Sequence, residues 1–133
     1  MGLYRMKVII PLAGPETAVE KTFGDFKNLI SVYGKPLIKY VADKRPYDLS
    51  KAVFILAEKT NKRYNIASRL KKVLGNRIEI FILDKVTDGA PCSVLKYLKE
   101  SDTKGDILID FIDQHLVLGS GFIKFIWDNR SKV

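Results

Sequence analysis

Several features are scarce in this chain, and each shortage excludes a class of protein. The 133 residues include one cysteine, Cys92, so an internal disulfide is excluded and a reducing compartment is favoured. No run approaches the roughly 18 consecutive apolar residues that a membrane helix needs. The apolar run in the opening "MGLYRMKVIIPLAG" is also too short for the core of a signal peptide. We therefore expect a cytoplasmic protein without a membrane partner.

The sequence also lacks internal repeats, low-complexity segments and linkers. Hydrophobic residues make up 47% of the chain and charged residues 29%, which is ordinary for a globular protein. A chain of this length buries roughly two thirds of its unfolded surface around one core. Residues 1–133 are therefore predicted to form a single domain.

Positive charge exceeds negative charge over the chain as a whole. Twenty-three Lys and Arg against fifteen Asp and Glu give a net charge of +8, which favours anionic partners such as nucleotides or sugar phosphates. The basic residues are spread out, and neither an RNA-binding aromatic signature nor a helix-turn-helix pattern is present. This distribution argues against nucleic acid as the partner.

Apolar runs alternate with amphipathic stretches along the chain. The runs at 6–12, 52–57, 78–83 and 107–111 predict buried strands, and 29–32 predicts a short one. One helix is expected to have Pro36 in its first turn. Three more are expected in "TNKRYNIASRLKKVLG", "APCSVLKYLKE" and "SGFIKFIWDN". Residues 13–28 predict a long loop. The pattern indicates an α/β fold, a Rossmann-like three-layer α/β/α arrangement with a mainly parallel sheet of about four to five strands.

Helix periodicity also predicts which side chains face the sheet. In "APCSVLKYLKE" the inward positions are Val94, Leu95 and Leu98. Cys92 is expected to be a small helix residue that faces the core, and not a nucleophile, because no histidine lies near it in sequence. The last helix is expected to place Phe122, Ile123, Ile126 and Trp127 against the sheet.

The run "LIDFIDQHLV" ends in two carboxylates, Asp110 and Asp113, followed by the only histidine, His115. Open parallel sheets bind ligands at the carboxyl ends of their strands. The loops at that edge should bring the following residues within reach of one ligand: Gly14, Lys27, Asp88, Gly89, Ala90, Asp113 and His115. Asp110 lies within the predicted strand, so it needs a hydrogen-bonded or charged partner.

Four phrases, "MKVIIPLAG", "KNLISVYGKPLIKYV", "DGAPCSVL" and "LIDFIDQHL", occur in an order and spacing that resemble the nucleotidyltransferase family that makes nucleotide-activated sugars and cholines. The resemblance covers residues 6 to about 117. It implies the nucleotide-binding half of a nucleotide-diphospho-sugar transferase fold. It also implies a reaction in which a sugar phosphate attacks the α-phosphorus of a nucleoside triphosphate, with Mg²⁺ present and pyrophosphate released.

The resemblance also implies roles for single residues. Lys27 corresponds to the family's phosphate-contacting lysine and Asp113 to its metal-binding aspartate, so both are candidate catalytic residues. The candidate nucleotide-binding residues are Ala13, Gly14, Asp88, Gly89, Ala90 and Gln114. Ordinary structural roles remain as alternatives: a solvated surface lysine for Lys27, helix or turn caps for Asp88 and Asp113, and packing or a surface contact for His115.

Two departures from the family pattern are chemically serious. In the glycine-rich loop, Glu16 replaces the second glycine and Ala18 replaces an arginine that neutralises phosphate charge. Glu16 is expected to bring a negative charge towards the triphosphate. The alternative is therefore a non-catalytic relative that serves as a nucleotide-binding or protein-interaction module. Because the resemblance stops at half of a family domain, a further hypothesis is that a second copy or a partner chain completes the fold.

Overall fold

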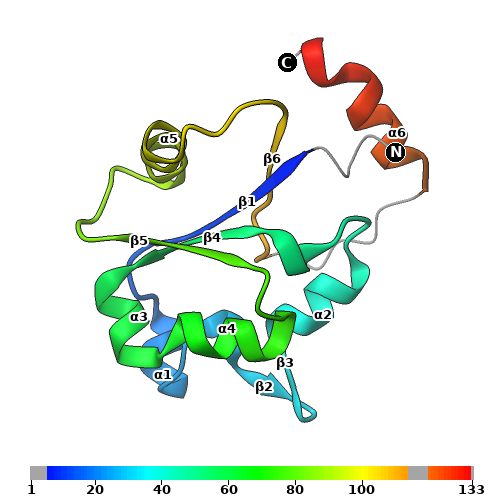
Figure 1. Ribbon diagram of the computed structural model, residues 1–133. Helices are drawn as coiled ribbons and strands as arrows, with labels where there is room; N and C mark the ends of the chain where they lie inside the picture. The colour runs from blue at the N-terminus through cyan, green and yellow to red at the C-terminus, as the bar shows by residue number, and fades with distance from the viewer. Residues whose placement is uncertain (1–5, 114–119, 133) are drawn as a thin grey trace.

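The computed structural model describes residues 6–113 and 120–132 (Figure 1). The first part of the chain forms β1 (Lys7–Leu12), α1 (Ala18–Phe23), the 3-10 helix η2 (Lys27–Leu29), β2 (Ser31–Val32), β3 (Lys35–Pro36), α2 (Leu37–Lys44) and the 3-10 helix η3 (Leu49–Lys51). The second part forms β4 (Val53–Ala57), α3 (Glu58–Tyr64), α4 (Ile66–Leu74), β5 (Glu79–Leu83), α5 (Ala90–Ser101), β6 (Ile107–Ile109), α6 (Ser120–Asn129) and η4 (Arg130–Lys132). No helix among the described residues is long and apolar enough to cross a membrane.

Four strands form one parallel sheet in the order β5-β4-β1-β6. Ile9 of β1 lies opposite Val53 of β4 and opposite Ile109 of β6, so β1 is paired on both sides. From β1 the chain first builds outwards through β4 and β5 and then returns to add β6 on the other side of β1. This order has a topological switch point between β1 and β6. The predicted α/β fold with a mainly parallel sheet is confirmed.

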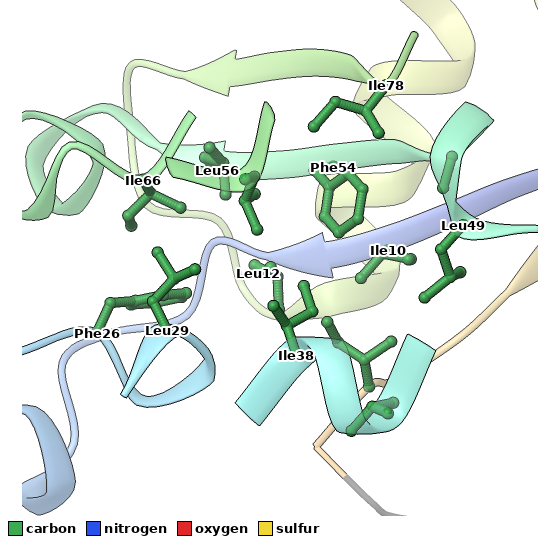
Figure 2. Close-up of a cluster of buried hydrophobic side chains, with 14 of the residues drawn as sticks. Ile10, Leu12, Phe26, Leu29, Ile38, Leu49, Phe54, Leu56, Ile66 and Ile78 are labelled. Carbon is green, nitrogen blue, oxygen red and sulfur yellow. The ribbon is translucent and has the colours of Figure 1, made fainter. Parts of the chain in front are cut away.

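The sheet separates two hydrophobic clusters because successive strand residues face opposite ways. On one face, Ile10 and Leu12 of β1 and Phe54 of β4 pack with Ile38 of α2 and Ile66 of α4 (Figure 2). On the other face, Ile9, Val53 and Ile55 pack with Val94 and Tyr97 of α5. Burying one such side chain contributes about 1.5–3 kcal/mol. Both faces of β1 and β4 are thus covered, which explains why these strands read as continuous apolar runs.

The structure corrects several predicted element boundaries. Residues 13–28 were predicted to be a loop but contain α1, and η2 begins at Lys27. The predicted helix over "TNKRYNIASRLKKVLG" is two helices, because Asn65 between them has a left-handed backbone with φ of 52°. Pro36 lies in β3 and precedes α2 instead of lying in its first turn.

Some predicted inward-facing residues are exposed. Leu95 and Cys92 of α5 face solvent, whereas Ser93, Val94 and Tyr97 are buried. Helix α6 forms where predicted, but it lies apart from the helices that cover the sheet (Figure 1). Its Phe122 and Phe125 are exposed, so the prediction that Phe122 packs against the sheet is wrong.

A buried ion pair fixes the end of β6. Arg45, just after α2, donates from Nε to Oδ2 of Asp110 at 2.8 Å and from Nη2 to Oδ1 at 3.3 Å. The Tyr47 hydroxyl also donates to Oδ2. The side chains of Arg45 and Asp110 are 1% and 11% exposed. Burial, together with the hydrogen bond to Asp110, raises the pKa of Tyr47, which keeps the phenol protonated as a donor. The partner expected for Asp110 is therefore present.

We expect Asp110→Ala to lower the free energy of unfolding by about 3–5 kcal/mol, because it removes the carboxylate that faces a buried guanidinium. Urea unfolding followed by circular dichroism measures this. The control is Asp113→Ala, three residues further along, where a half-exposed ion pair with Lys27 and a hydrogen bond from Asn28 should together contribute less, about 1–2 kcal/mol. A loss below 1 kcal/mol for Asp110→Ala would show that the pair does not hold β6 in place.

Candidate functional site

A pocket of about 210 Å³ opens at the carboxyl ends of β1 and β6, which is the switch point of the sheet. Its walls come from the segment after β1, from η2, from the loop between β5 and α5, and from the segment after β6. Ligand pockets typically have volumes of about 300–1,000 Å³, so this pocket is smaller than most. It can enclose part of a nucleotide while the rest extends into solvent.

Six of the residues predicted for the site line this one pocket: Ala13, Gly14, Lys27, Gly89, Ala90 and Asp113. Asp88 is exposed beside the pocket and does not line it. Gln114 and His115 lie outside the described residues. Segments separated by up to about a hundred residues therefore meet, as the expected convergence of strand ends requires.

Lys27 and Asp113 form an ion pair in the pocket wall. Nζ of Lys27 lies 3.3 Å from Oδ1 of Asp113, and Nδ2 of Asn28 donates to the same oxygen at 3.3 Å. The Asp113 side chain is 48% exposed, whereas Asn28 is buried. Lys27 and Asn28 are adjacent in η2, so this short helix sets the position of both groups that contact Asp113. The carboxylate is thus held in place and remains accessible to a ligand.

Glu20 is a further pocket residue, one that the sequence analysis did not identify. It is 3% exposed, and its Oε2 accepts the Thr17 backbone N–H at 2.9 Å and the Thr17 hydroxyl. These contacts form a capping box at the start of α1. Burial on its own would raise the pKa of Glu20, but the hydrogen bonds from Thr17 and from the backbone outweigh it and hold the pKa below its ordinary value. The spacing Thr-x-x-Glu was the available sequence signal for this helix start.

The position of the Glu16 carboxylate differs from the one expected from the sequence. Its Oε1 lies 2.9 Å from Nη1 of Arg63 and accepts a hydrogen bond from the Tyr64 hydroxyl at 2.7 Å, so α3 holds the carboxylate. The hydrogen bond to Glu16 raises the pKa of Tyr64. Glu16 does not line the pocket. The expectation that it directs a negative charge at a bound triphosphate is wrong, because its charge is paired on α3.

The two glycines of the pocket differ in what they require. Gly89 has φ of 123°, a backbone conformation that side chains rarely adopt, so the turn before α5 accounts for this glycine by itself. It is also the N-cap of α5, the position suggested for Asp88 as an alternative to nucleotide binding. Gly14 has no such backbone constraint, and a Cβ built there would meet nothing within 4 Å. The space above Gly14 is therefore open to a ligand.

Two hydroxyl groups line the wall on the α5 side. Oγ1 of Thr87 lies 2.6 Å from Oγ of Ser93, and both hydroxyls are within hydrogen-bonding distance of the Gly89 carbonyl, at 3.1 Å and 3.3 Å. Sequence reasoning missed both residues, because isolated hydroxyl residues occur throughout the chain. They give this wall a polar edge beside the glycine turn.

The charged side chains that line the described pocket are Glu20, Lys27 and Asp113, so two negative charges face one positive charge. A triphosphate would be repelled by this excess unless a cation accompanies it. Mg²⁺ is usually bound by one or two carboxylates together with substrate phosphates. Asp113 suits that role, while the described part of the chain contains no group of three or more His, Cys, Asp or Glu that could hold a metal without a ligand's help.

Comparisons with known proteins provide no family assignment. A scan against protein-family models and a search of curated proteins both found no match to this chain.

We expect Glu20→Gln to reduce stability at neutral pH and to flatten its dependence on pH. Because the folded pKa is depressed, the carboxylate's contribution is complete above its unfolded pKa of about 4.5 and is lost as pH falls through the lower folded value. The measurement is the urea midpoint between about pH 3 and pH 6.

The exposed Glu100 of α5 provides the matched control, because Glu100→Gln should follow the wild-type curve. Identical curves for Glu20→Gln and wild type would contradict the role given to the Thr17–Glu20 contact.

Proposed function

We propose that this chain is the nucleotide-binding part of a nucleotidyltransferase-like protein, with the Rossmann-like three-layer arrangement of the nucleotide-diphospho-sugar transferase fold. It binds a nucleoside triphosphate or a nucleotide sugar together with Mg²⁺ in the switch-point pocket. The observation that carries the proposal is the Lys27–Asp113 pair, which lines that pocket together with the open backbone at Gly14. The fold alone would not support this function, since α/β sheets host many activities.

Each pocket residue has a chemical role in this proposal. Asp113 would hold Mg²⁺, which supplies charge neutralisation at the phosphate oxygens. The Lys27 ammonium contacts the α-phosphate, and the backbone at Ala13 and Gly14 lies close to the phosphates without a side chain in the way. The nucleobase lies against Gly89 and Ala90, where the Thr87 and Ser93 hydroxyls provide polar contacts.

The reaction of the proposed ancestor is a nucleotidyl transfer to a sugar phosphate. An oxygen of the acceptor phosphate forms a bond to the α-phosphorus, the bond from that phosphorus to the bridging oxygen breaks, and pyrophosphate leaves with the electron pair. In this chain Lys27 is the only cationic side chain among the described residues that line the pocket. It is a point charge and lacks the two-pronged contact of an arginine.

The second candidate function is a non-catalytic module that binds a nucleotide or a protein. Ala18 favours it, because the arginine clamp of the family is missing there and such charge-stabilising groups contribute on the order of a thousandfold in rate. β6 is an edge strand of the sheet, and Ile109 in it and Phe111 just after it are exposed, so a second copy or a partner chain could extend the sheet there. A pyrophosphate-release assay over several sugar phosphates separates the two functions. Cytoplasmic localisation remains part of the proposal.

We expect titration calorimetry with ATP, CTP, GTP and UTP in the presence of MgCl₂ to show binding of at least one nucleotide. Asp113→Ala should weaken that binding by about tenfold or more, because it removes the metal ligand. Gly14→Val should have a similar effect by filling the space above the backbone, where an added Cβ meets no other atom within 4 Å in the free protein.

The matched control is Lys21→Ala, which removes an exposed lysine of α1 that does not line the pocket and should leave affinity within about twofold. If none of the four nucleotides binds to the wild-type chain, the proposed function is refuted. If Lys21→Ala and Asp113→Ala weaken nucleotide binding equally, the binding is only a general attraction between a basic protein and an anion.

A further inference from the structure

The strand β5 is the outermost strand of the sheet on the side away from β6. The Glu79 backbone N–H donates to the Ala52 carbonyl at 3.0 Å, so the odd-numbered residues of β5 direct their backbone groups towards β4. The backbone N–H and C=O groups of Ile80 and Ile82 therefore point away from the sheet. No strand within residues 6–113 and 120–132 pairs with this outer side of β5.

The β5 edge lacks the features that usually keep an edge strand from pairing. Proteins protect such edges with lysine, proline, a bulge or a very short strand. β5 has the sequence EIFIL, so every residue after Glu79 is apolar. Ile82 is exposed, and Ile80 and Phe81 are half-buried. The other edge strand, β6, has three residues and offers fewer free backbone groups. Of the two edges, β5 is therefore the one better able to accept another strand.

The charge around β5 favours a second copy of this chain as the occupant of the edge. With a net charge of +8, two copies repel each other on average. Residues 78–100, which comprise β5, the loop after it and α5, contain three lysines and four acidic residues, so this stretch has a net charge of −1. Two copies can therefore approach each other along β5 and α5 without the repulsion expected from the chain as a whole.

The sequence of β5 matches itself when a second copy runs antiparallel to it. With a two-fold axis at Phe81, Ile80 of one copy lies opposite Ile82 of the other, and the two residues can exchange the backbone hydrogen bonds that β4 does not use. This register places isoleucine beside isoleucine and one Phe81 ring beside the other. Lys85, exposed just after the strand, lies diagonally across from Glu79 of the other copy, within reach of a long side chain.

We propose that the β5 edge is an interface between two copies of this chain, in which antiparallel β5 strands join the two four-stranded sheets into one. The inference goes beyond the proposed function and does not depend on it, because no residue of β5 lines the switch-point pocket. It assigns the second copy to β5 and leaves the β6 edge free. The loop after β5 contributes Val86 and Thr87 to the pocket, so the interface lies beside the candidate site without covering it.

Light scattering after size-exclusion chromatography, at about 5 to 500 μM protein, covers the micromolar affinities expected of a small interface. We expect the mass to approach twice the 15.1 kDa of one chain at the highest concentration. Ile82→Lys should weaken dimerisation about tenfold or more, because it places an ammonium group against the apolar edge of the other copy. The matched control is Ile109→Lys in β6, since Ile109 is 40% exposed and Ile82 is 38% exposed. Circular dichroism checks that both variants fold.

Disulfide cross-linking tests the register independently of any loss of folding in Ile82→Lys. The exposed Cys92 is first replaced by serine, so that each protein has one thiol. Opposite residues of an antiparallel pair have Cα atoms about 4.5–5.5 Å apart, which a disulfide can span. A mixture of Ile80→Cys and Ile82→Cys proteins should therefore form a linked pair on oxidation with diamide. Either variant alone should not, because its two thiol-bearing residues have Cα atoms about 8 Å apart.

Several results would overturn the inference. One is a wild-type chain that keeps the mass of a single copy at the highest concentration. Another is a dimer that Ile109→Lys dissociates and Ile82→Lys does not, which would assign the contact to β6. Linkage in Ile82→Cys alone, with none in the mixture, would contradict the proposed axis at Phe81. A mass that grows beyond two copies would indicate open association instead of a closed pair. None of these results depends on whether a nucleotide binds.

Discussion

The structure depends on the parallel pairing of β1 with strands on both of its sides. β4 lies on one side and β6 on the other, and Ile9 is matched to Val53 and Ile109 at the same level of the sheet. The connection that leads from β1 to β4 covers one face of the sheet, and the connection that leads from β5 to β6 covers the other. The segments that follow β1 and β6 therefore separate at the carboxyl edge. The candidate pocket occupies the space between them. Without β6 in this position, Asp113 would not lie beside Lys27.

Charged groups near this edge are each fixed by contacts with neighbouring groups. Arg45 and Tyr47 hold Asp110, Thr17 holds Glu20, and Asn28 with Lys27 holds Asp113. Such supporting contacts cost little to maintain once the side chains are ordered by packing, and they orient the groups that a ligand would meet. This arrangement explains how a small domain can present a defined pocket at the ends of short strands.

The sequence was sufficient for the four strands of the parallel sheet and for their convergence, because β-branched runs bounded by turn residues are strong signals. It was insufficient for the short β2–β3 pair, since the strand predicted at 29–32 is β2 at Ser31–Val32 only and β3 was not predicted. It was insufficient wherever a contact spans a long separation. Asp110 needed a partner, but nothing local identified Arg45, 65 residues away. Helix α1 was missed because six residues carry almost no periodicity, although its Thr17–Glu20 spacing was visible. Glu16 was misjudged because its pairing with Arg63 depends on how α3 packs.

The proposed nucleotide site rests on the sequence phrases that resemble nucleotidyltransferases and on the geometry of the pocket. The most direct test of that site is a backbone amide NMR titration of the wild-type chain with MgCl₂ and the nucleotide that binds. The account predicts that the largest shifts fall on Gly14, Lys27, Gly89 and Asp113, at the carboxyl edge of the sheet. Largest shifts on the exposed lysines of α4, Lys71 and Lys72, would contradict it and indicate attraction to surface charge instead.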